Sequence, residues 1–137
     1  MPCRIWQRPC SIEQKIMKTG KQDNTEVGKL GEALARKHLE QKGYKILEQN
    51  YRTRYAEIDL VARKKDVLVL VEVRTKIGEQ FGTPEETLNR RKIQKVKQNA
   101  LAYAARAKWN KLYRVDAMCI VLAEDRTLRR IVHYENI

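Results

Sequence analysis

The sequence predicts an α/β fold with a mixed five-stranded sheet flanked by helices, in the order α-β-β-β-α-β-β. Two strand-like runs, Glu57–Val61 and Val67–Val73, are separated only by a turn signal, which favours an antiparallel hairpin. A helical stretch then separates Val67–Val73 from a further strand-like run, Tyr113–Leu122, and such a βαβ unit implies parallel strands with a right-handed crossover. The chain has 137 residues, of which 42% are hydrophobic, and this suits one domain with a proper core.

The N-terminal segment 1–22 shows no sustained hydrophobic period and is rich in basic residues. We expect a basic, flexible tail ahead of a single domain over 23–137; the tail is either an arm that contacts phosphate or an extension without a role. The first helix is expected to begin at Asp23, which has capping-box spacing with Glu26, and to end before Gly43. Glu32 lies near its middle and, on spacing alone, is a solvated helix residue.

The first strand is expected over Tyr44–Tyr51. Because the links to the next two strands are short, the three strands should form an antiparallel meander. The motif Thr83-Pro84-Glu85-Glu86 predicts the start of the second helix, with a threonine cap and proline at the first helical position, and this helix is expected to run to about Lys108. The turn after Tyr113–Leu122 leads into a fifth strand, Leu128–Tyr134.

One acidic residue interrupts the most apolar strand. Glu72 lies where burial would strip water from its carboxylate, so a basic partner or a metal ion must compensate. Side chains alternate along a strand, which places Arg74 on the same face as Glu72, and hairpin pairing can bring Asp59 across from them. The expected site has two carboxylates and one cation. It fits either a magnesium-dependent phosphodiesterase or a structural ion pair.

The charge balance favours a polyanionic partner. The formal net charge is +12 and the pI about 9.8, which places nucleic acid ahead of an anionic membrane, although a merely basic protein is the alternative. Five basic residues gather on the second helix and form either a phosphate-binding surface or a solvated face: Arg90, Arg91, Lys92, Lys95 and Lys97.

The sequence shows neither a membrane-targeting segment nor a cysteine pattern typical of disulfides or zinc. No apolar run approaches the roughly 20 residues that span a bilayer, and no signal-peptide core is visible, so we expect a cytoplasmic protein with no membrane partner. The three cysteines are odd in number and lack metal-site spacing, which argues against a disulfide framework and against zinc.

Several motifs together resemble the YraN-like bacterial family: GKLGEALA around Glu32, GYKILEQNY, AEIDLVA, VLVEVRTK, FGTPEETLNRRK and YRVDA. The resemblance covers Glu26 to about Asn136. It implies a restriction-endonuclease-like fold, related to archaeal Holliday-junction resolvases, with the superfamily motif PD-(D/E)-x-K. By this resemblance Asp59 is the first metal ligand, Glu72 the second and Glu32 an additional acid, and the cofactor is Mg²⁺ or Mn²⁺.

Two positions depart from the superfamily motif. Ile58 replaces the proline, which is a common variation in this family. Arg74 replaces the lysine, and arginine cannot act as a general base, although it can stabilise charge on a phosphoryl group. Lys76, which shares strand parity with Arg74, could take the role of the lysine, and so could Lys92 from the basic helix.

Three functions are therefore expected, in this order. The first is a metal-dependent endonuclease that acts on branched or structured DNA. The second is a nucleic-acid-binding protein with a degenerate nuclease site, and the third is a basic protein-interaction module. A homodimer is implied by the related resolvases, which grip two arms of a junction.

Overall fold

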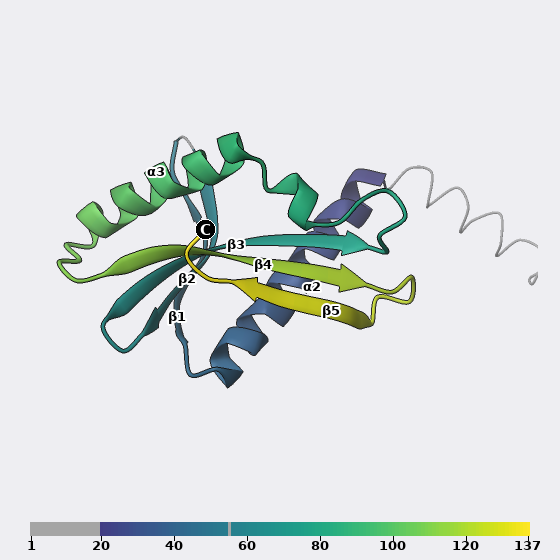
Figure 1. Cartoon of the computed structure of the whole chain (residues 1–137), viewed down its shortest axis with the longest axis horizontal. Helices are drawn as coiled ribbons and strands as arrows, with labels where there is room; N and C mark the ends of the chain where they lie inside the picture. The colour runs from purple at the N-terminus through teal and green to yellow at the C-terminus, as the bar shows by residue number, and fades with distance from the viewer. Residues whose placement is uncertain (1–19, 55) are drawn as a thin grey trace, which may run out of the picture.

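The computed structural model describes residues 20–54 and 56–137, and it has the predicted α/β architecture (Figure 1). The elements follow the predicted order, with one short 3₁₀ turn added: α2 (Gly20–Gln41), β1 (Lys45–Arg52), β2 (Glu57–Lys64), β3 (Val67–Ile77), η1 (Glu85–Thr87), α3 (Arg90–Arg106), β4 (Tyr113–Leu122) and β5 (Leu128–Tyr134). Helix α2 crosses one face of the sheet and α3 lies over the other (Figure 1).

The sheet is mixed, with the strands in the order β1-β2-β3-β4-β5. The first three strands pair antiparallel, β3 and β4 pair parallel, and β4 and β5 pair antiparallel. This confirms both the predicted meander and the predicted βαβ unit, in which α3 is the crossover helix.

Two apolar clusters, one on each face of the sheet, fix the register of β3. Val69, Val71 and Val73 join the cluster under α2, whereas Leu68 and Leu70 join the cluster under α3. A slip of one residue would exchange these two sets, so burial on both faces specifies a single register. Strand alternation therefore places Glu72 on the α3 face of the sheet.

Gly31 lets helix α2 approach the sheet closely enough to place Glu32 near the start of β2. A Cβ atom at Gly31 would lie 1.8 Å from the Oγ1 of Thr75 on β3 and under 3.0 Å from two further atoms of that side chain, so the helix or the strand would have to shift. The glycine in the motif GKLGEALA is thus a packing requirement at the contact between α2 and β3.

Both predicted helix starts were wrong in position. The predicted capping box does form, because Thr83 Oγ1 accepts from the Glu86 N–H at 3.3 Å and Glu86 Oε2 accepts from the Thr83 N–H at 3.2 Å. This capping box starts only the short turn η1, because the backbone of Leu88 leaves the helical region with φ −88° and ψ 70°. Asn89 then caps α3 by accepting from the Lys92 N–H at 2.8 Å.

Helix α2 begins at Gly20, so Asp23 lies inside the helix and is not its cap. Residues 1–19 lie outside the described residues, and with them most of the predicted tail over 1–22 together with Cys3 and Cys10. Cys119 is buried in β4 as a free thiol. None of the helices among residues 20–54 and 56–137 is long and apolar enough to cross a membrane.

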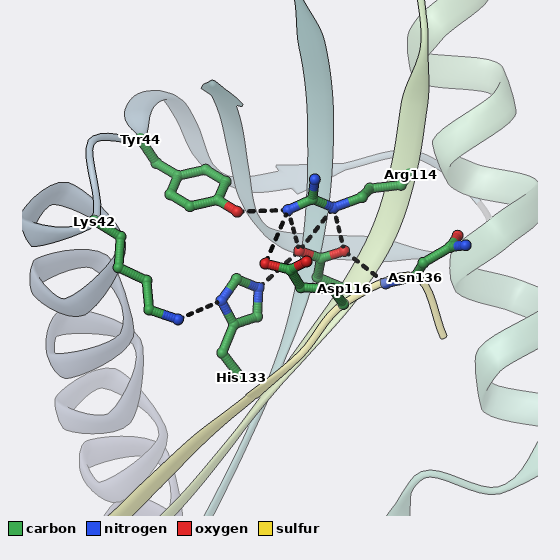
Figure 2. Close-up of polar contacts among 7 residues, drawn as sticks. Lys42, Tyr44, Arg114, Asp116, His133 and Asn136 are labelled. Atoms are coloured by element: carbon green, nitrogen blue, oxygen red, sulfur yellow. Dashed lines mark hydrogen bonds and ion pairs between the residues drawn. The ribbon is translucent and has the colours of Figure 1, made fainter. Parts of the chain in front are cut away.

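A buried ionic network ties the C-terminal segment to the sheet (Figure 2). Asp116 is fully buried and accepts from the Arg114 guanidinium at 2.9 Å and from the Asn136 N–H at 3.0 Å, while His133 Nε2 lies 2.7 Å from its Oδ2. Arg114 also donates to the Tyr44 hydroxyl. Burial alone would raise the pKa of Asp116, but the hydrogen bonds from His133 and Arg114 outweigh it and hold that pKa below its usual range.

This network lies on the α2 face of the sheet. Asp116 alternates with Val115 and has the parity of Met118 and Ile120, which belong to the cluster under α2. Glu72 lies on the opposite face, so the network around Asp116 supports the fold and is separate from the expected site.

Candidate active site

Two acidic residues lie together where strands β2 and β3 part. The last paired residues at this end of the β2–β3 ladder are Leu60 and Val71, and Asp59 and Glu72 are the next residues beyond them. The backbone N–H of Val73 donates to Asp59 Oδ2 at 2.8 Å, so the carboxylate replaces a backbone acceptor at the point where the ladder ends. This contact holds the Asp59 side chain against β3, beside Glu72.

Both carboxylates have raised proton affinities, and burial is the main cause for each. Burial is the main cause that raises the pKa of Glu72, the charge of Asp59 raises it further, and the result is about 7 in spite of opposing effects from Lys92 and Arg74. Burial also raises the pKa of Asp59, although the hydrogen bond from the Val73 N–H opposes this. A pair of this kind favours either a shared proton or additional positive charge at neutral pH.

Two cations flank Glu72, whose side chain is only 4% exposed. Arg74 Nη1 lies 3.7 Å from Glu72 Oε1, and Lys92 Nζ lies 3.4 Å from the same oxygen. Their side chains are 33% and 40% exposed, so each cation reaches from the buried carboxylate to the surface. The prediction that Glu72 and Arg74 share a face of the sheet agrees with this contact.

Arg74 is held in place by the turn η1. Its Nε donates to Thr87 Oγ1 at 2.7 Å, and the Thr87 hydroxyl donates in turn to the carbonyl of Pro84 at 2.6 Å. Sequence reasoning missed Thr87, because the motif Thr83-Pro84-Glu85-Glu86 was assigned to a long helix and not to a turn that supports Arg74.

The two lysines proposed for the motif position behave differently. Strand β3 extends through Ile77, so Lys76 has the strand position that the sequence analysis required, but its Nζ donates to the Phe81 carbonyl at 3.4 Å. Lys92 is the lysine that lies beside Glu72. Whether either residue has a catalytic role stays a prediction.

Glu32 faces Asp59 across a cleft of about 320 Å³ whose lining also includes Asn50, Arg52 and Glu57. Burial raises the pKa of Glu32, and the charge of Asp59 raises it further. Across the side chains that the structure describes, no three His, Cys, Asp or Glu residues gather closely enough to hold a metal ion together. The geometry therefore centres on the pair Asp59 and Glu72, and metal binding by the three acids stays a prediction.

Comparison with known proteins gives the family of this chain. Residues 31–120 match the family described as "Uncharacterised protein family UPF0102". The chain belongs to the UPF0102 family. This is the YraN-like family that the sequence motifs resemble. The matched range contains every proposed site residue, from Glu32 to Lys97.

Three relatives illustrate how far the UPF0102 likeness extends. A UPF0102 protein of Thermodesulfovibrio yellowstonii is 40% identical over 111 residues, which cover 81% of this chain and 94% of the relative. One of Alkaliphilus oremlandii is 38% identical over 118 residues, covering 82% of this chain and 97% of the relative. One of Syntrophomonas wolfei is 51% identical over 80 residues, covering 58% of this chain and 70% of the relative.

The basic helix of this UPF0102 chain divides into two parts. Arg90, Arg91, Lys95 and Lys97 are exposed, whereas Lys92 turns toward the sheet and Glu72. The sequence carries a signal for this difference, because Lys92 lies one helical turn before the buried Val96 and therefore on the same face of α3. Phosphate binding by these residues stays a prediction.

Proposed function

We propose that this UPF0102 protein is a metal-dependent endonuclease that hydrolyses phosphodiester bonds in branched or structured DNA. The observation that carries the proposal is the pair of half-buried Asp59 and buried Glu72, flanked on the α3 face by Arg74 and Lys92. The resemblance of the motifs to PD-(D/E)-x-K nucleases supports the same reaction. The family's own description names no activity, so the proposal rests on the site and on that resemblance.

The donor set suits a hard divalent cation. Asp59 and Glu72 supply carboxylate oxygens, which Mg²⁺ and Mn²⁺ prefer, and the raised pKa values mean that added positive charge would relieve their repulsion. These two residues would hold the ion, with Glu32 contributing from across the cleft. A bound Mg²⁺ supplies an activated water and neutralises charge that develops on the phosphate. Two carboxylates are enough in principle, because Mg²⁺ usually keeps several water ligands.

The cations have separate roles in this proposal. Arg74 stays charged and is fixed by Thr87, so it can hold the scissile phosphate but cannot accept a proton. Lys92 offers an amine beside Glu72, which can donate a hydrogen bond to the attacking water or to a phosphate oxygen. Lys92 thus replaces from a helix the lysine that the superfamily motif places on the strand.

Binding of DNA is assigned to the exposed basic residues of α3. Arg90, Arg91, Lys95 and Lys97 carry four exposed charges on a single helix, close in sequence to η1, the turn that holds Arg74. Contacts of this kind go to phosphates and do not read sequence. The preference for branched DNA, and assembly as a homodimer on a junction, are carried over from the resolvase resemblance.

A second candidate function is a DNA-binding protein whose nuclease site has degenerated. The arrangement around Glu72 favours it, because Arg74 and Lys92 both lie within 4 Å of one carboxylate oxygen and already compensate its charge. In this case the acids form a structural ion cluster, and divalent cations do not bind there.

A cleavage screen decides between the two functions. Purified protein is incubated with single strands, duplexes, flaps, splayed arms and four-way junctions, each with Mg²⁺, with Mn²⁺ and with EDTA. The nuclease predicts cleavage of at least one branched substrate with either metal, and none in EDTA or with Asp59→Asn. Salt-dependent binding without any cleavage would identify the degenerate site, whereas neither binding nor cleavage would rule out both candidates.

A further inference from the structure

A second cleft, of about 690 Å³, lies between helix α3 and the turn that joins β1 to β2. Among the residues that the structure describes, its lining carries three basic side chains, Arg54, Lys95 and Arg106, and no carboxylate. This charge favours an anionic occupant. Because most of the wall is apolar, including Ala102 and part of Tyr51, a small inorganic anion would leave much of the cleft unfilled.

Asn99 forms part of this wall and has an unsatisfied donor. The residue is only 5% exposed, and its Oδ1 accepts from the Thr53 hydroxyl at 3.0 Å. Its Nδ2 is buried and has no hydrogen-bond partner among the described residues. A buried amide without a partner is costly, and an acceptor brought by a ligand would complete its hydrogen bonding.

The aromatic ring of Tyr51 forms part of the same wall. Tyr51 packs edge-to-face against Tyr103, with ring centroids 4.9 Å apart, and its hydroxyl accepts from Arg106 at 3.1 Å. These two contacts hold both the ring and the guanidinium at the border of the cleft. A flat heterocycle with carbonyl or ring-nitrogen acceptors suits the apolar wall and the amide, while an attached phosphate suits the basic residues.

The cleft lies further along α3 than the candidate active site. Lys92, at Glu72, is followed by Lys95 and Asn99 in the cleft, and the seven residues from Lys92 to Asn99 rise by about 10 Å along the helix. That rise corresponds to roughly three steps of one B-DNA strand. One strand can therefore reach both the carboxylates and the cleft.

We propose that this cleft binds one unpaired nucleotide of the DNA substrate, close to the bond that is cut. The base packs against Tyr51 and accepts from the Asn99 amide, and the phosphates on either side of this nucleotide are held by Arg54, Lys95 and Arg106. The inference rests on the proposed function and deepens it, because it names an unpaired base as the feature by which branched DNA is distinguished from duplex.

The test compares two DNA duplexes in EDTA, so that binding is measured without cleavage. One duplex carries a single unpaired nucleotide, and the other carries an abasic residue at the same position, which keeps the phosphates and removes the base. Ala102→Phe fills the cleft from an exposed wall position. Ala105→Phe is the matched control, since Ala105 is exposed on the same helix and lies outside the cleft lining.

The wild type is expected to bind the unpaired base roughly tenfold more tightly than the abasic duplex, in keeping with stacking of one base. Ala102→Phe should lose this preference and keep salt-dependent binding, whereas Ala105→Phe should retain the preference. A 2-aminopurine at the unpaired position should change fluorescence with the wild type and with Ala105→Phe only.

Two results would overturn the inference while leaving the proposed function intact. They are equal wild-type affinity for the two duplexes, and a base preference that survives in folded Ala102→Phe. Absence of salt-dependent binding to either duplex would instead overturn the proposed function, and this inference with it.

Discussion

The ammonium of Lys92 lies 3.4 Å from the carboxylate of Glu72, so a helix supplies a lysine at the site where the strand carries arginine. Arg74 approaches the same oxygen from the strand at 3.7 Å. The two cations enter from different elements and differ in chemistry, since an amine can be deprotonated and a guanidinium cannot. This contact gives the nuclease proposal a lysine that the motif position lacks.

Divalent binding is the most direct consequence of the carboxylate pair. Calorimetric titration with Mn²⁺ should give a binding signal for the wild type and none for Asp59→Asn, because that change removes one of the two proposed ligands that lie together. Asp66→Asn is the control, since Asp66 is an exposed residue of the turn between β2 and β3. A wild type that shows no divalent binding, even with DNA present, would contradict the metal hypothesis.

Stability of the metal-free protein should fall as pH rises between about 4.5 and 7. The folded state holds the Glu72 proton up to a pKa of about 7, whereas the unfolded chain releases it near 4.5. Stabilisation from this proton is complete below the lower value and is lost as pH rises through the higher one. The loss is on the order of 3 kcal/mol.

Urea denaturation in EDTA across this pH range measures the effect. Glu72→Gln should flatten the pH dependence, and Glu124→Gln, at an exposed position, should leave it as in the wild type. Parallel curves for the wild type and Glu72→Gln would show that Glu72 has no raised pKa.

DNA binding should weaken when exposed charge is removed from α3. Replacing Arg91, Lys95 and Lys97 by alanine should reduce the slope of log affinity against log salt by roughly one for each lost phosphate contact. A matched triple variant at Lys37, Lys45 and Lys65 removes the same charge from exposed positions outside α3. Equal slopes in the two variants would place the DNA footprint elsewhere on the protein.

The sequence was most informative where local signals agreed with burial. The bounds of β4 and β5 were predicted as they are found, because Tyr113–Leu122 and Leu128–Tyr134 are strand-like runs with a clear turn between them. The start of α3 was wrong because two capping signals compete over seven residues, and only the backbone conformation of Leu88 decides that Asn89 caps the long helix.

At the site, the alternation of side chains along a strand predicted that Glu72 and Arg74 share a face of the sheet, and the contact between them agrees. The same alternation could not predict the contact of Thr87 with Arg74, because that contact depends on how the loop after β3 folds back. Lys92 was grouped with its basic neighbours, although its spacing from Val96 marks it as part of the buried face of α3.

The last prediction separates Arg74 from Lys92. If Arg74 holds the phosphate, Arg74→Ala should reduce single-turnover cleavage far more than DNA affinity, because contacts that strengthen in the transition state appear in the chemical step. Arg74→Lys keeps the charge and restores the superfamily residue, so it should retain or raise cleavage. Lys92→Arg keeps a cation near Glu72 but removes the amine, and it should reduce cleavage while leaving affinity similar.

Cleavage and affinity are measured on the same folded preparations, with Lys97→Arg as the control for a conservative change on the same helix. Equal cleavage by Lys92→Arg and the wild type would remove Lys92 from the mechanism. If the wild type and Arg74→Lys both bind DNA but cut none of the tested structures, the protein is the DNA-binding alternative, and Glu72, Arg74 and Lys92 form a structural ion cluster.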